Sequence, residues 1–240
     1  MSTSPVSRFS STDHGRRRQA IVESLLSEIF QGAIDAGQHL VTQDVAERFG
    51  VSHTPVREAL AALAGIGIID LVPNRGAIVR RVSHREIREI CQVRRALECE
   101  AIRSACGRID RSLLTELDDE FRQLIAAEGS SAARVLEQAK TLDSRLHDSI
   151  AASCGNAFLA AELGRLKLLF RAFRDVAYIQ YRIDNDLPRI VEEARQHLAI
   201  VEALAGGHRS LAVRAMSRHI RSGLKYWLRV RPDHTPRIVG

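Results

Sequence analysis

Residues 51–60, with the sequence VSHTPVREAL, limit the fold of this chain more than any other stretch. Ser52 and Thr54 carry hydroxyl groups that can accept hydrogen bonds from the first backbone N–H groups of a helix. Pro55 fits a first helical turn, where the N–H that it lacks would be unpaired in any case. The stretch therefore predicts a short helix that begins near Ser52.

The two sides of this predicted helix differ in character. Val56, Leu60 and Leu63 recur at helical spacing, so one side can pack against a core. The opposite side of the first two turns carries three polar side chains, which are His53, Thr54 and Arg57. This outer face holds the groups that would contact the bases and phosphates of DNA.

Shorter elements flank the helix on both sides. Residues 42–50 predict another short helix that opens at Thr42 and stops at Gly50, so a tight turn containing glycine joins the two. Residues 68–72 and 77–82 are rich in β-branched side chains and are separated by Pro-Asn-Arg-Gly. That pattern predicts a hairpin, with Gly76 supplying a positive φ. The result is a helix-turn-helix followed by a two-stranded wing.

These residues resemble the GntR family of bacterial transcription regulators, in the branch that has an all-helical effector domain of the FCD type. The resemblance is carried by Gly37, Leu40, residues 45–46, 51–52 and 54–60, Gly67 and residues 73–76. It implies a winged helix-turn-helix that binds a double-stranded DNA operator. From the resemblance and from their placement, the residues expected at the DNA are Arg16, Thr42, His53, Thr54, Arg57, Asn74, Arg75 and Gly76.

His53 departs from the family pattern, because members usually carry arginine at this position. An arginine can bind guanine through two hydrogen bonds, which gives about 1–3 kcal/mol of discrimination, whereas a neutral imidazole offers one donor and one acceptor. We therefore expect the operator to differ at the base pair that faces His53.

The domain organisation follows from length and periodicity. A chain of 240 residues, with 45% hydrophobic and 27% charged residues, suits two modest globular domains. We expect a disordered tail at 1–15, the winged helix-turn-helix at 16–82, an effector-binding and dimerisation domain at 83–230, and a tail at 231–240. The fold class is mainly α. A long helix is expected at 17–36, and an antiparallel six-helix bundle at 84–106, 111–127, 132–152, 156–182, 188–205 and 208–229.

The placement of charge is more informative than its total. The net charge is +6, but residues 1–82 contain 9 Arg against 8 Asp or Glu. Basic residues instead lie at the start of the first predicted helix, on the polar face of the helix at 52–63 and in the hairpin turn, namely residues 16–18, Arg57 and Arg75. Residues 208–240 hold 8 Lys or Arg against Asp233 alone. That run is either a solvated helix face or a surface that lies against acidic neighbours, and both interpretations remain open.

The chain has no secretory signal and no apolar run of about 18 residues, so we expect a cytoplasmic protein without a membrane partner. The cysteines, Cys91, Cys99, Cys106 and Cys154, form no C-x-x-C pair. We interpret them as small apolar residues in a reducing compartment.

A second set of residues points to a metal. Asp143 and His147 are four positions apart, so on a helix they project from one face. His197 precedes the Gly206-Gly207 break by 9 residues and His219 follows it by 12. If the two helices fold back as a hairpin, the two imidazoles lie within roughly one turn of the same height.

On spacing alone, a helical histidine is more often a hydrogen-bonded core or surface residue than a metal ligand. The family resemblance adds a ligand pattern, because metal-binding FCD members have a D-x-x-x-H pair, a second His before an apolar helical stretch, and a third His near the last helix. Asp143, His147, His197 and His219 fill all four positions. The resemblance thus implies one divalent metal per chain, with Zn²⁺ preferred and Ni²⁺, Mn²⁺ or Fe²⁺ also suited to nitrogen and oxygen donors.

The effector implied is a small organic acid. Arg94 matches the arginine that the family carries on the first effector helix, and its guanidinium can bind a carboxylate through two hydrogen bonds. Arg171, Arg174 and Tyr178 follow at helical spacing and are secondary effector-binding residues, with solvent-exposed or dimer-facing side chains as the alternative.

The sequence therefore favours a homodimeric repressor that binds a palindromic operator and releases it when a carboxylate binds. Two alternatives remain. His147-Asp148 is also the dipeptide of HD-type phosphohydrolases, which use a metal to activate water. The chain could also be a DNA-binding protein with a purely structural metal.

Overall fold

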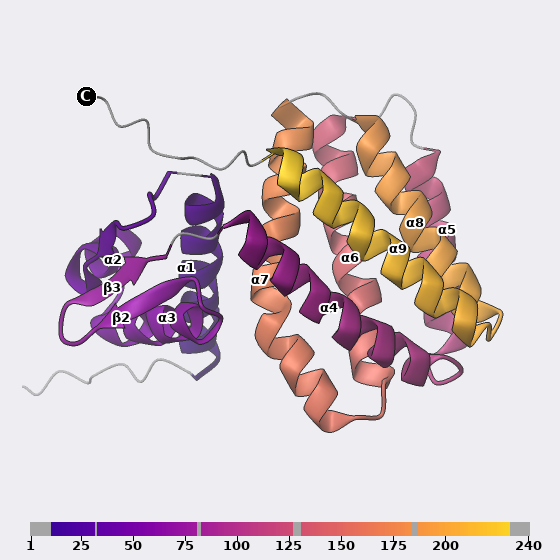
Figure 1. Ribbon diagram of the computed structural model, residues 1–240, viewed down its shortest axis with the longest axis horizontal. Helices are drawn as coiled ribbons and strands as arrows, with labels where there is room; N and C mark the ends of the chain where they lie inside the picture. The colour runs from indigo at the N-terminus through magenta and orange to yellow at the C-terminus, as the bar shows by residue number, and fades with distance from the viewer. Residues whose placement is uncertain (1–10, 32, 81–82, 127–130, 184–186, 231–240) are drawn as a thin grey trace, which may run out of the picture. The chain divides into compact units, whose positions relative to one another are not determined.

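The computed structural model describes residues 11–31, 33–80, 83–126, 131–183 and 187–230 (Figure 1). The chain divides into two compact units, Met1–Val82 and Ser83–Gly240, each with its own core. None of the described helices is both long and apolar enough to cross a membrane.

The first unit contains helices and a small sheet. Its elements are α1 (Ser11–Gln31), β1 (His39–Leu40), α2 (Thr42–Phe49), α3 (His53–Gly65), β2 (Ile69–Val72) and β3 (Gly76–Val79). The predicted inner face of α3 is confirmed, because Val56, Leu60 and Leu63 are buried. They pack against α1, which supplies Ile21, Leu25 and Ile29.

The turn between α2 and α3 has the expected glycine. Gly50 ends α2 with φ +62°, a left-handed conformation that a residue without a Cβ adopts most easily. Ser52 occupies the N-cap position of α3 in an extended conformation, but its side chain accepts no capping hydrogen bond. The helix therefore begins where the sequence predicts, without the predicted hydroxyl cap.

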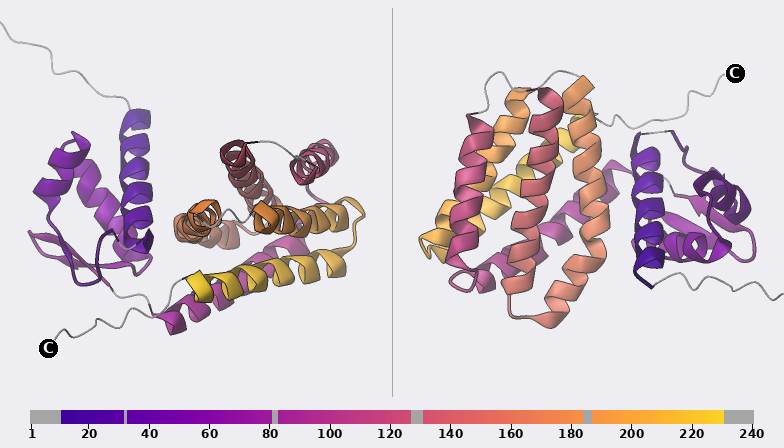
Figure 2. Two further views of the ribbon diagram at one scale, coloured as in Figure 1. Left: turned by 90° about the horizontal axis from the view of Figure 1, so that it is seen from above. Right: turned by 180° about the vertical axis from the view of Figure 1, so that it is seen from behind.

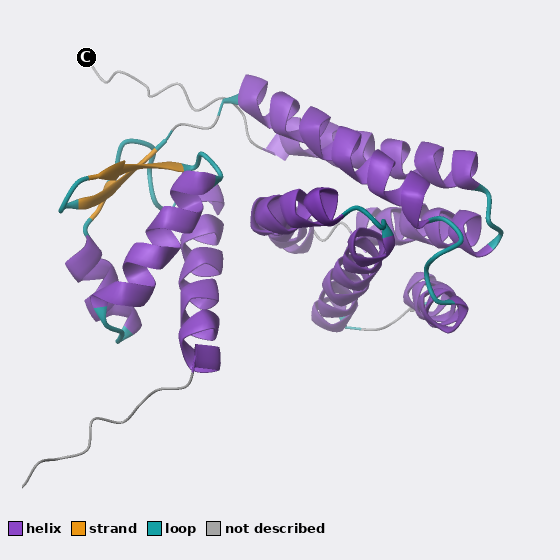
Figure 3. Cartoon of the chain, turned by 90° about the horizontal axis from the view of Figure 1, so that it is seen from below, coloured by secondary structure: helices purple, strands orange, loops and turns teal. Residues whose placement is uncertain are grey.

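The wing has one more strand than the sequence predicts. The sheet is antiparallel in the order β1-β3-β2, and the helices of this unit lie to one side of it (Figure 3). The strand β1 covers two residues, which is too short for an alternating apolar pattern to reveal. It approaches Gly76 so closely that a Cβ there would lie 2.0 Å from the carbonyl oxygen of Leu40, and Gly76 has φ +110°. Only glycine allows β1 to pair at this point.

Helix α1 also differs from its predicted bounds of 17–36. It begins at Ser11, so the expected disordered tail is wrong for residues 11–15, while residues 1–10 lie outside the described residues. It ends at Gln31, and beyond it the N–H groups of Ala33 and Ile34 both donate to the carbonyl of Glu28. These bonds satisfy a terminal carbonyl of the helix and turn the chain away from the helical path.

In the second unit, the described residues form six helices. They are α4 (His84–Ala105), α5 (Arg111–Ile125), α6 (Ala132–Ser153), α7 (Ala157–Ile183), α8 (Leu187–Ala205) and α9 (Arg209–Val230). Helix α4 opens with a capping box, in which the Ser83 hydroxyl accepts from the N–H of Glu86 and the Glu86 carboxylate accepts from the N–H of Ser83. The predicted boundaries agree to within a few residues at each end.

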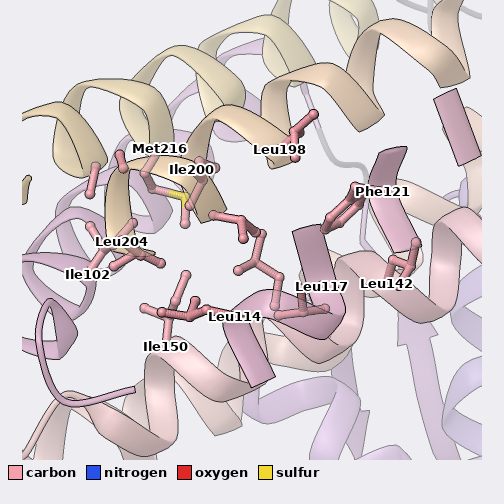
Figure 4. Packing of buried hydrophobic residues seen from close by; sticks show 14 of the residues in the cluster. Ile102, Leu114, Leu117, Phe121, Leu142, Ile150, Leu198, Ile200, Leu204 and Met216 are labelled. Carbon is pink, nitrogen blue, oxygen red and sulfur yellow. The ribbon is translucent and has the colours of Figure 1, made fainter. Parts of the chain in front are cut away.

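Helices α4 and α9 run side by side in opposite directions (Figures 1 and 2). Helix α8 also packs on α9, and the turn at 206–208 connects these two helices. The core between the helices is built mainly from aliphatic side chains, together with Phe121 and Met216 (Figure 4). Cys106 and Cys154 are buried, Cys91 and Cys99 are partly buried, and all four are free thiols. The second unit thus forms a packed frame into which polar side chains from several helices project.

Candidate metal centre and nucleic-acid interface

A hollow of about 890 Å³ lies between α3 and the wing of the first unit. Six of the eight residues expected at the DNA line it, namely Thr42, His53, Arg57, Asn74, Arg75 and Gly76. Thr54 is exposed on α3 and Arg16 is exposed on α1, but neither lines the hollow.

The lining of this hollow is electrostatically one-sided. Arg57 and Arg75 contribute positive charge, and among the described residues no carboxylate lines it. Asn74 has φ +59°, so the wing turn places two consecutive polar side chains, Asn74 and Arg75, at its exposed tip. A concave, cationic surface beside an exposed helix suits the phosphates and base edges of a nucleic acid.

The second unit brings Asp143, His147, His197 and His219 together, with one donor atom from each lying within 4.8 Å of the others. Asp143 and His147 share a face of α6 beside the buried Leu142 and Leu146. His197 comes from the buried face of α8, and His219 from that of α9.

The imidazole rings contact one another directly. The ring centroids of His197 and His219 are 4.2 Å apart, which is the close approach expected from the hairpin at Gly206-Gly207. Asp143 Oδ1 lies 3.3 Å from His197 Nε2 and 3.8 Å from His147 Nε2. The ring of Phe121 stacks on His197 with centroids 5.4 Å apart, which fixes the plane of that imidazole.

These donors fit a divalent ion. His147 Nε2, His197 Nε2 and His219 Nδ1 are buried and have no hydrogen-bond partner among the residues that the structure describes. One buried polar atom without a partner costs about 1–3 kcal/mol, and a cation between the three nitrogens and the Asp143 carboxylate would satisfy all of them. Donors about 2.0–2.2 Å from one ion are roughly 3–4 Å apart, so small side-chain adjustments complete the geometry.

Glu98 of α4 sets the orientation of one donor, and the sequence did not single it out. It is buried, and its Oε2 accepts from His147 Nδ1. This hydrogen bond favours the tautomer of His147 that has its proton on Nδ1. In that tautomer Nε2 is unprotonated and faces the cluster, as a metal ligand requires. The other oxygen, Oε1, accepts from Arg94 Nε at 2.6 Å.

The titration behaviour of Glu98 and His219 agrees with this arrangement. Although burial opposes the charged form of His147, the Glu98 carboxylate raises the pKa of His147, so a metal would have to displace a proton from that ring. Although burial opposes its charge, the guanidinium of Arg94 and the imidazole of His147 lower the pKa of Glu98 to about 2, so it is a carboxylate at neutral pH. Burial, reinforced by His197 and His147, holds the pKa of His219 well below its ordinary value. A neutral His219 has a lone pair available for a metal.

A cavity of about 340 Å³ adjoins the cluster. Asp143 and His147 form part of its wall together with Arg94, and Arg171 lines it from α7. Two of the four expected effector-binding residues therefore face this space. Arg174 and Tyr178 belong to a part of α7 whose side chains lie outside the described residues.

Asp148 also lines the cavity but is not part of the cluster. It accepts from Lys167 Nζ at 2.8 Å and from Arg171 Nη2 at 3.1 Å. Because the carboxylate is held by these cations, the structure separates it from the donors around His147, contrary to the joint role that a His-Asp dipeptide has in a phosphohydrolase.

Replacing Glu98 by glutamine is expected to weaken metal binding by about ten- to hundredfold, because the amide keeps the shape of the side chain but lacks the charge that polarises His147. Competition titration with a chromophoric zinc chelator measures this change. Glu100→Gln, on an exposed position of the same helix, is the matched control and should retain wild-type affinity. Equal affinities for both variants would contradict the orienting role of Glu98.

A winged helix-turn-helix unit followed by a separate all-helical unit is the architecture of a DNA-binding transcription regulator. The chain belongs to the GntR family: residues 17–79 match the model of the bacterial regulatory proteins of that family, and residues 89–222 match the FCD domain. Since this family consists of transcription regulators, a phosphohydrolase activity is set aside.

Relatives cover most of the chain. It is 31% identical over 205 residues to the HTH-type transcriptional repressor RspR of Escherichia coli, covering 84% of this chain and 85% of that protein. It is 28% identical over 196 residues to a probable D-xylose utilization operon transcriptional repressor of Paenarthrobacter nicotinovorans, covering 82% of each chain.

Solved structures show the same fold. The structure of E. coli McbR/YncC matches with a TM-score of 0.67 at 19% identity, covering 89% of this chain and 98% of the other. A GntR regulator from Rhodococcus sp. RHA1 matches with a TM-score of 0.59 at 22% identity, covering 90% and 100%.

Proposed function

We propose that the protein is a homodimeric repressor that binds a palindromic DNA operator. Two copies of α3 would enter successive major grooves, with Arg57, Thr54 and His53 at the base edges and Arg75 at a neighbouring groove. The exposed outer face of α3 and the cationic hollow beside it support this assignment. The names of two relatives, both repressors, support the direction of control.

The second unit is proposed to hold one divalent metal, with Zn²⁺ preferred, and a small carboxylate effector. Asp143, His147, His197 and His219 would hold the ion. When bound, such an ion supplies open coordination positions that a carboxylate oxygen can fill. Arg94 would donate to the same carboxylate from the cavity wall.

The observation that carries the sensing part is the combination of imidazole nitrogens that have no partner among the described residues with an adjoining cavity whose wall contains the partly buried guanidinium of Arg94. A structural metal would need the donors but not the cavity. A carboxylate that binds one arrangement of the helical unit more tightly than another shifts the population of DNA-binding states by that difference in affinity.

The test uses an operator that the wild-type protein selects from random-sequence duplexes. Fluorescence anisotropy then measures operator affinity for the zinc-loaded and the metal-free protein, with acetate, lactate, pyruvate or succinate added. At least one acid is expected to lower operator affinity by about tenfold, and only in the loaded protein. Arg94→Lys should reduce the response, because an ammonium cannot form the two-hydrogen-bond pair, whereas Arg95→Lys should not.

A response to none of these acids, with metal bound and operator affinity intact, would leave a DNA-binding protein with a structural metal and would overturn the sensing part. Failure to select any DNA sequence would overturn the operator assignment instead.

A further inference from the structure

The wall of the cavity beside the metal cluster includes a second group of cations. Lys167 and Arg171 lie one helical turn apart on α7, and both contact the single carboxylate of Asp148. Two positive charges share one negative charge, so this group has an excess of one positive charge. The side chains are 37% and 28% exposed, which leaves both cations accessible from the cavity.

The cavity wall also contains Arg94, whose charge is matched differently. Its Nε donates to the buried Glu98, and its Cζ lies 4.9 Å from the centroid of the Phe170 ring. Glu98 neutralises Arg94, so an anion beside Arg94 needs the charge of the metal in addition to the donors of Arg94.

The charges around the cavity define the ligand that balances them. The described lining residues include three cations, which are Arg94, Lys167 and Arg171. They also include three carboxylates, which are Glu98, Asp143 and Asp148. These opposite charges cancel one another, and His147 is neutral when it binds a metal. A divalent ion therefore leaves the site with two positive charges, and a ligand with two negative charges restores neutrality.

We propose that the effector is a short aliphatic dicarboxylate, an inference that rests on the proposed function and specifies its ligand. One carboxylate binds at the metal and Arg94, and the second binds at Lys167 and Arg171. The same wall carries apolar side chains, among them Phe170, Leu163 and Ala151, which suit a methylene chain. Because the second anionic group meets cations that are already in place, it adds affinity without a further ordering of the site.

The test compares acids of matched chain length on the zinc-loaded full chain by isothermal titration calorimetry. Succinate is expected to bind at least about tenfold more tightly than butyrate, and glutarate than valerate, because a charge-assisted contact at a partly exposed site contributes about one factor of ten. In Lys167→Met and Arg171→Met, the difference in affinity between succinate and butyrate should disappear.

Arg165→Met is the matched control, since Arg165 lies on the same helix but pairs with Glu162 and does not line the cavity. It should keep the wild-type preference. If butyrate and succinate bound the loaded wild-type protein with equal affinity, the binding of a second carboxylate at Lys167 and Arg171 would be overturned. The proposed function would remain intact. If neither acid bound, nor any other carboxylate, the sensing function itself would fail.

Discussion

Protein that carries both His147→Ala and His219→Ala is expected to lose its divalent metal. Wild-type protein purified with zinc should hold one ion per chain by plasma mass spectrometry, and the double variant should hold almost none after dialysis. The variant keeps Asp143 and His197 of the four donors. If the loss is half the stabilisation of a four-ligand site, it amounts to roughly 5 kcal/mol, or more than a thousandfold in affinity.

The control variant is His208→Ala, because His208 is an exposed histidine of the same unit outside the cluster. It should retain one equivalent of zinc. Both alanines remove buried atoms, so circular dichroism and gel filtration must show that the double variant remains folded. Asp143→Asn, which keeps the side-chain volume and removes the charge, should also release the metal. Full metal occupancy in a folded double variant would contradict the proposed metal site.

Arg57→Ala is expected to lower the affinity for a selected operator by about ten- to hundredfold. Arg57 is exposed on the polar side of α3, and its guanidinium lines the hollow between that helix and the wing. A bidentate arginine contact with guanine contributes about 1–3 kcal/mol of discrimination, so removing it should also relax the preference for one base pair in each half-site. Anisotropy titrations with the operator and with single-base variants measure both effects.

Arg48→Ala provides the comparison for charge alone. Arg48 belongs to the same unit, but it donates to Glu28 at 2.8 Å and does not line the hollow. Its loss should change the affinities for operator and unrelated DNA by the same small factor. If Arg57→Ala behaved in the same way, with all sequences affected alike, Arg57 would be a phosphate contact and the base-reading role would be wrong.

The elements with strong periodicity could be predicted from the sequence. The apolar positions of α3 and of the helices α4–α9 recur every three or four residues, and glycines or a capping serine mark their ends. The strand β1 could not be found in this way, because His39 and Leu40 owe their pairing to Gly76 far along the chain. The ends of α1 were also not predicted correctly. At its N-terminal end, polar residues extend the helix before its apolar stripe begins.

The two pairs of residues in the cluster could be predicted from local spacing, whereas their union into one metal site was predicted from the family resemblance. Asp143 and His147 occupy one helical face, and a glycine break places His197 opposite His219. The role of Glu98 could not be predicted from the sequence, because an acidic residue four positions after Arg94 has the pattern of an ordinary surface ion pair. Its second partner, His147, is 49 positions away, and only the packing of α4 on α6 brings the two together. Lys167 and Arg171 acquire their shared contact with Asp148 in the same way.

The double restraint on Arg94 has a thermodynamic consequence. Its guanidinium is fixed by the hydrogen bond to Glu98 and by the ring of Phe170, so the side chain occupies one rotamer before any acid arrives. Immobilising a free arginine side chain costs about 1.5–2 kcal/mol of rotamer entropy, and here folding has already incurred that loss. The proposed acid would therefore lose mainly its own translational and rotational freedom on binding, which favours tight binding even of a molecule with a few carbon atoms.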